Sequence, residues 1–188
     1  MRSDLKQNIL EVLRDSFKAI NKNDIVALKE LSNHIIHKAS TLQDEYSTSI
    51  AVISYALSKI FERAHYRDYK DWNKFYNTCM TNLKNAIVYL EKNDTQEYEA
   101  SIKNIFNVID RLSSNLKRYT QEVIEKARIH RASRIHEHGI SVERTAKLLG
   151  ISQWELMEYI GKTGISDTEL SITKTVADRL KFTRSIFK

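Results

Sequence analysis

The chain has no proline, and its four glycines all lie between residues 139 and 164. Because these two residue types most often end or break helices, their absence from residues 1–138 favours long helices there. The single cysteine, Cys79, excludes an internal disulfide framework and a zinc site built on paired cysteines. No run reaches the roughly 18 apolar residues that a membrane span needs. We therefore expect a cytoplasmic protein without a membrane partner.

Composition and charge bound the class of protein. Of 188 residues, 41% are hydrophobic and 29% charged, which is typical of a globular chain with a real core. The formal net charge is +6, which mildly favours a polyanionic partner. Basic residues gather in two stretches, 126–138 and 174–188, on either side of the segment that holds the glycines.

Residues 1–94 predict an N-terminal helical bundle in an all-α protein. Apolar residues recur at helical spacing, and polar breaks fall at 21–24, 41–47 and 93–95. Ser3, Asp24 and Asp94 are suited to cap the helices that follow them. The segment 50–61 is apolar on most faces, so we expect a central buried helix there. Cys79 lies on an apolar stripe and is interpreted as a packed core residue.

Residues 95–138 predict one long, basic connecting helix. Its apolar residues alternate in steps of three and four, which is the heptad pattern of a helix–helix seam. Such a seam can pack within the same chain, or it can join two chains, and we expect a homodimer. The seam residues are Ile102, Ile105, Ile109, Leu112, Leu116, Tyr119 and Val123.

Residues 139–188 predict a helix-turn-helix followed by a terminal basic helix. Ser141 is suited to cap the first short helix, and Ala146 is small enough for two helices to meet closely there. Gly150 falls where the backbone must turn, and Ser152 with Glu155 has the spacing of a capping box. Such a module can bind DNA or a protein, and a plain helical hairpin is a further alternative.

Duplex DNA is the partner that we predict for this module, and transcriptional regulation without catalysis, metal or cofactor is the predicted function. Gln153, Trp154 and Glu155 would begin the recognition helix, where Gln can pair with adenine and Glu can accept from cytosine. That helix has no Arg or Lys before Lys162. Phosphate contacts would therefore come from residues around it: Arg128, Arg131, Arg134, Arg144, Lys147 and Lys162.

The same segment resembles the helix-turn-helix of a small prokaryotic family of uncharacterised, antitoxin-like proteins. The resemblance covers residues 139–166 and is carried by Ser141, Ala146, Gly150-Ile151-Ser152, Trp154-Glu155-Leu156 and Gly164-Ile165. It implies a DNA-binding or antitoxin-like regulator with Gln153 and Trp154 at the exposed start of the recognition helix. The chain departs from that family in its long helical N-terminal region and in Thr145, where a second alanine is usual. A module that binds a basic protein is thus the first alternative function.

A second alternative is cleavage of RNA. Arg131 and His136 have the spacing of the arginine–histidine motif of the higher-eukaryote-and-prokaryote nucleotide-binding RNase domains, which are all-α. In those enzymes the pair contacts RNA at a dimer interface. Other catalytic patterns, including a phosphate-binding glycine loop and a nucleophile elbow, are absent from the sequence.

Overall fold

A computed structural model describes residues 2–108, 112 and 114–163. Every regular element within these ranges is a helix, so the predicted all-α class is confirmed. None of the described helices is long and apolar enough to cross a membrane. The helices are α1 (Ser3–Asn21), α2 (Ile25–Leu42), α3 (Glu45–Phe61), the 3-10 turn η1 (Ala64–Asp68), α4 (Trp72–Glu91), α5 (Thr95–Asn107), α6 (Ser114–Glu137), α7 (Val142–Leu149) and α8 (Gln153–Thr163).

In the part of the chain without glycine, three connections between helices share one pattern. A polar residue with left-handed backbone angles is followed by an aspartate that caps the next helix. Asn23, Gln43 and Asn93 have φ angles of 54°, 49° and 62°. Each is followed by an aspartate whose side chain accepts a hydrogen bond from a backbone N–H in the first turn of the next helix. Asparagine tolerates the left-handed region better than most residues, which accounts for two of these turns, while Gln43 adopts the same backbone without that preference. The predicted caps Asp24 and Asp94 are confirmed. The prediction for Ser3 is wrong, because Ser3 is the first residue of α1 and the N-cap residue is Arg2, whose side chain makes no capping hydrogen bond.

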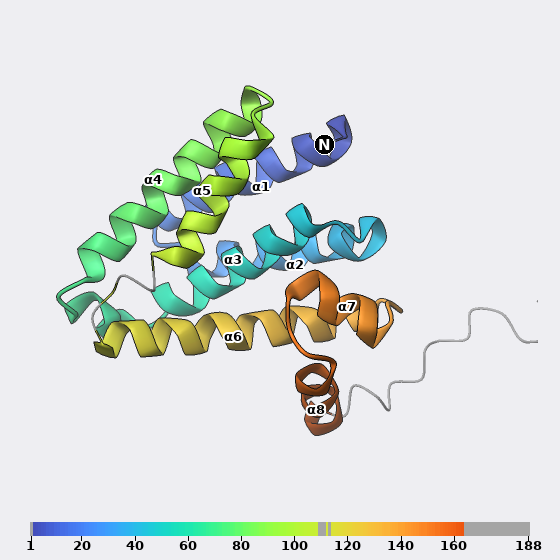
Figure 1. Cartoon of the computed structure of the whole chain (residues 1–188). Coiled ribbons are helices and arrows are strands. Elements are labelled where there is room, and N and C mark those ends of the chain that lie inside the picture. The colour runs from blue at the N-terminus through green and yellow to red at the C-terminus, as the bar shows by residue number, and fades with distance from the viewer. Residues whose placement is uncertain (1, 109–111, 113, 164–188) are drawn as a thin grey trace, which may run out of the picture.

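Helix α3 lies at the centre of the core, as the apolar run at 50–61 predicts. It packs against α1, α2, α6 and α7, and twelve of its residues are buried. Helices α4 and α5 pack on each other, and α4 also contacts α1 (Figure 1). Cys79 is completely buried in α4, and burial raises the pKa of its thiol far above the usual range. It is a core residue, as predicted.

The stretch 95–138, predicted as one helix, contains two. Helix α5 ends at Asn107 and packs on α4, whereas α6 begins at Ser114 and runs beside α3. The described seam residues divide accordingly. Ile102 and Ile105 of α5 are buried, and so are Leu116 and Val123 of α6. Leu112, between the two helices, is also buried, and Tyr119 of α6 is partly buried. The heptad pattern is therefore accounted for by packing within one chain. The described part of the seam therefore offers no free apolar surface, and the homodimer stays a prediction.

Helices α6, α7 and α8 pack on one another at one end of the molecule. Helix α7 also contacts α3, and the C-terminal half of α6 lies between the other helices and α8 (Figure 1). Ala146, Leu149, Leu156 and Ile160 join the same continuous core as the N-terminal helices. Residues 139–163 are thus anchored to the bundle. The predicted terminal basic helix lies outside the described residues.

Candidate functional site

The connection between α7 and α8 has the local geometry that the sequence predicts. The Ser141 hydroxyl accepts from the Arg144 N–H at 3.2 Å and caps α7. Gly150 ends α7 in the left-handed region, with φ 63° and ψ 37°. A Cβ at Gly150 would meet nothing within 4 Å, so the need for glycine comes from the backbone angle alone. Ala146 is buried where the helices meet.

A reciprocal capping box begins α8. The Ser152 N–H donates to Glu155 Oε2 at 2.8 Å, and the Glu155 N–H donates to Ser152 Oγ at 3.1 Å. These hydrogen bonds lower the pKa of the Glu155 carboxyl. Because Glu155 is occupied in this way, it is a poor candidate for the predicted contact with cytosine. Helix α8 then continues through Gly161 to Thr163.

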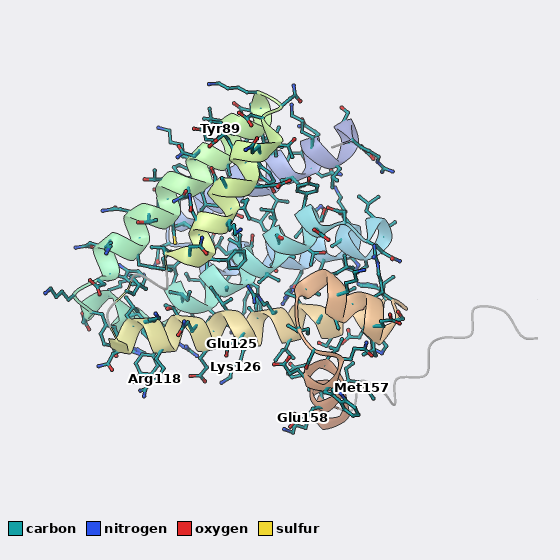
Figure 2. All side chains as sticks on the ribbon, in the orientation of Figure 1. Tyr89, Arg118, Glu125, Lys126, Met157 and Glu158 are labelled. Atoms are coloured by element: carbon teal, nitrogen blue, oxygen red, sulfur yellow. The ribbon has the colours of Figure 1, made fainter. Side chains whose placement is uncertain are left out.

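One face of α8 is exposed and partly apolar. Leu156 and Ile160 point into the core, whereas Gln153, Trp154 and Met157 are exposed. Trp154 is 80% exposed and Met157 51%, which is unusual for such large apolar side chains. Figure 2 shows Met157 and Glu158 at the outer edge of α8. Gln153 and Trp154 thus lie where the recognition-helix interpretation expects them.

The predicted phosphate-binding cations are placed very differently from one another. Arg131 is 1% exposed and cannot reach a DNA backbone, which corrects its predicted role. Arg134 pairs with Glu137 at 2.6 Å, and Lys162 pairs with Glu158 at 2.5 Å. Arg128 lies over the Phe106 ring, and Arg144 donates to Gln43. Lys147 is exposed and forms no ion pair with a described residue.

A cleft of about 470 Å³ opens between α8 and the bundle. Helix α8 contributes Tyr159 and Thr163 to its lining, and α3 contributes Tyr55. Helices α2 and α6 supply the other lining residues: Lys29, Asn33, His130, Arg131, Ser133, Arg134 and Glu137. Cationic side chains outnumber the single carboxylate in this cleft.

Arg131 is held by three neighbours, none of which is an acid. Its Nη1 donates to Asn33 Oδ1 at 2.8 Å, and its Nη2 lies 3.0 Å from His130 Nδ1. The guanidinium carbon is 3.9 Å from the centre of the Tyr55 ring, which is a cation–π contact. No described carboxylate lies within salt-bridge distance, and Nε has no hydrogen-bond partner among the described residues. A buried guanidinium without a counter-charge is costly to maintain.

His130 is neutral because of this arrangement. Burial lowers its pKa from 6.5 to about 4, and the neighbouring Arg131 charge acts in the same direction. A guanidinium can only donate hydrogen bonds, so Nδ1 of His130 must accept and its proton must lie on Nε2. The ring also stacks on Tyr55, with centroids 4.7 Å apart. Protonation at Nδ1 would break the hydrogen bond to Arg131.

We predict that acid destabilises the protein partly through His130. With a folded pKa near 4 and an unfolded pKa near 6.5, the unfolded state binds the proton first. This contribution to stability is complete above pH 6.5 and is lost as the pH falls towards 4. Because the ring is only partly buried, we expect about 1–2 kcal/mol. Urea unfolding of the wild type and His130→Asn between pH 7.5 and 4 measures it, since Asn keeps an acceptor but does not titrate. Parallel curves would contradict the prediction.

Arg131 and His136, the pair of the RNase interpretation, have separate partners in the described structure, and cleavage of RNA stays a prediction. No described hydrogen bond or ring contact joins Arg131 to His136, and His136 does not line the cleft. Instead, Nδ1 of His136 donates to the Ile140 carbonyl at 2.7 Å, which ties the end of α6 to the loop before α7. Within the described ranges, no cluster of three or more His, Cys, Asp or Glu side chains is suited to a metal ion.

Sequence reasoning missed most of the cleft. Lys29, Asn33, Tyr55 and Tyr159 come from three helices, and no spacing in the sequence relates them. The one available signal was Arg131 itself, because Ala127, Arg131 and Ile135 follow one buried face of α6.

No protein-family model, curated protein or solved structure matches the chain, so the geometry described above is the basis for the function.

Proposed function

We propose that the protein is a DNA-binding regulator in which α7 and α8 act as a helix-turn-helix. The supporting observation is the start of α8, where the Gly150 turn and the Ser152–Glu155 capping box fix a helix whose Gln153 and Trp154 are exposed. Packing of α6 against both helices makes a three-helix unit, an arrangement found in three-helix variants of the helix-turn-helix. In this arrangement α8 enters the major groove, and Gln153 contacts a base edge.

Charge limits how tightly such a unit binds. Within residues 139–163, Arg144, Lys147 and Lys162 are balanced by Glu143, Glu155 and Glu158. The phosphate contacts therefore come from a few side chains, and affinity should be modest and depend on salt with a shallow slope. Lys147 is the clearest of them, because it is exposed on α7 and no described carboxylate neutralises it.

We predict that Lys147→Gln weakens binding to random-sequence and genomic duplex DNA. Loss of one phosphate contact should reduce the slope of log affinity against log salt by roughly 1. Fluorescence anisotropy across a salt series measures both quantities. Lys84→Gln, an equal change of charge on the exposed side of α4, is the control and should bind like the wild type. If no duplex binds at low salt, or if the two variants behave alike, this mode of docking is wrong.

The exposed apolar side chains favour a second candidate, which is a protein partner on α8. Trp is the residue type most enriched among interface residues that dominate binding energy, and Met adapts to many surfaces. Trp154 and Met157 both lie on the exposed side of α8, next to the carboxylate of Glu158. A partner with an apolar pocket and a basic rim would fit this face.

Trp154→Ala should weaken binding of a protein partner without destabilising the folded protein. Because the indole is 80% exposed, we expect the melting temperature to change little. Binding of a partner that covers this face should fall by about 2 kcal/mol or more. Pull-down of basic proteins, followed by calorimetry with the purified partner, measures the loss. Val26→Ala removes an exposed apolar side chain from α2 and should leave binding unchanged.

A further inference from the structure

We propose that the cleft between α8 and the bundle is a binding site for a small molecule that carries an oxyanion, either phosphate or carboxylate. The guanidinium of Arg131 forms the floor of this site. It is almost completely buried, yet the cleft reaches it from solvent. This inference depends on the cleft alone and does not require that α8 binds DNA.

Unused hydrogen-bond donors are the first argument. A guanidinium has five N–H groups, and the described neighbours of Arg131 accept two of them, at Asn33 Oδ1 and His130 Nδ1. Its Nε–H has no described partner. Because Asn33 Oδ1 already accepts, the amide nitrogen of Asn33 is left as a further donor. A carboxylate, or two oxygens of a phosphate, accepts two parallel hydrogen bonds from such a fork.

The electrostatic field of the cleft is the second argument. Lys29, Arg131 and Arg134 line it, and its one carboxylate, Glu137, already accepts from Arg134. Lys29 forms an ion pair with Glu62, but the distance from Nζ to Oε1 is long at 4.0 Å. His130 adds no charge at neutral pH. An incoming anion therefore meets uncompensated positive charge in a partly desolvated site, where attraction is much stronger than in bulk water.

Size and lining restrict the ligand further. A volume of about 470 Å³ lies in the range of small-molecule pockets. Tyr55 and Tyr159 contribute ring surface and hydroxyl groups that can donate. The site thus suits a metabolite of moderate size with one oxyanion and an apolar or ring portion. Because Tyr159 and Thr163 belong to α8, an occupant would contact α6 and α8 at the same time.

The test uses the full chain in the absence of DNA. Two probes, inorganic phosphate and succinate, are titrated into it at a constant ionic strength that is set with chloride. Calorimetry measures affinity, and the Nε–H resonance of Arg131 reports contact at the proposed donor. We expect saturable binding of at least one probe with a shift of that resonance. Saturation by phosphate alone or by succinate alone would support the site and identify the preferred oxyanion.

Three variants locate the binding. Arg131→Met should lower affinity roughly 10- to 100-fold, as expected for loss of charged hydrogen bonds. Lys29→Met lies at the exposed edge of the cleft and should also weaken binding, which keeps the test valid if Arg131→Met does not fold. Arg118→Met, the same change at an exposed arginine of α6 outside the cleft, should have no effect. Absence of saturable binding by either probe, or equal binding by all variants, would overturn the proposal.

Discussion

Leu156→Ala is expected to release α8 from the molecule. Leu156 is completely buried and is one of two α8 residues, with Ile160, that enter the common core. Removing a buried leucine side chain costs about 2–5 kcal/mol, because the lost transfer energy is added to that of a cavity. Helix α8 is short and is the last described helix, so the loss should fall mainly on its own packing.

Hydrogen exchange measures this effect locally. Amides of α8 should lose protection in Leu156→Ala, while those of α3 should keep theirs, because α3 is packed on several other helices. Met157→Ala is the matched control: it is the neighbouring residue on the same helix, but it is 51% exposed and should change stability by less than about 0.5 kcal/mol. Equal loss of protection in α3 and α8 would show that the helices unfold as one unit.

The helices and their caps could be predicted because they depend on local sequence. Asp24 and Asp94 cap their helices through contacts within three residues, and so do Ser141 and Ser152. The patterns also show which residues point inwards: Cys79 and the run at 50–61 are buried as expected. The caps depend on residues close in the chain, and the buried faces follow the apolar periodicity of the local sequence.

The end of α5 was not predictable from the heptad pattern. Ile102 and Ile105 are buried residues of α5, which packs on α4, while Leu116 and Val123 are buried residues of α6, which packs on α3, yet their spacing suits a single seam. Apolar periodicity shows which face of a helix is buried, but it does not show against which partner. The same pattern is therefore compatible with one long helix or with two shorter ones that pack on different neighbours.

The surroundings of Arg131 were not predictable for a related reason. Its type and its basic neighbours suggest a surface that contacts phosphate, but its position on the helix places it on the buried face with Ala127 and Ile135. The ring of Tyr55 and the amide of Asn33 make that burial tolerable, and they come from α3 and α2. Contacts between distant helices decide whether a cation is solvated or buried.

Glu158→Gln should strengthen binding to DNA if α8 docks as proposed. In the wild type, Glu158 accepts from Lys162 at 2.5 Å, and both side chains are largely exposed. The substitution removes a carboxylate that phosphates repel and leaves Lys162 available for a phosphate. We expect affinity to rise by roughly tenfold, and the salt slope to become steeper by about 1.

The sign of this effect distinguishes the two partner classes. A basic protein docked on the same face would lose an attractive charge, so Glu158→Gln should weaken that complex, whereas it should strengthen a DNA complex. Anisotropy across a salt series with duplex DNA, and calorimetry with any purified protein partner, measure the two cases. Glu11→Gln makes the same change of net charge on the exposed side of α1, away from α8, and corrects for a general charge effect. If Glu158→Gln and Glu11→Gln change affinity equally, then the exposed face of α8 is not the docking surface, whichever partner binds.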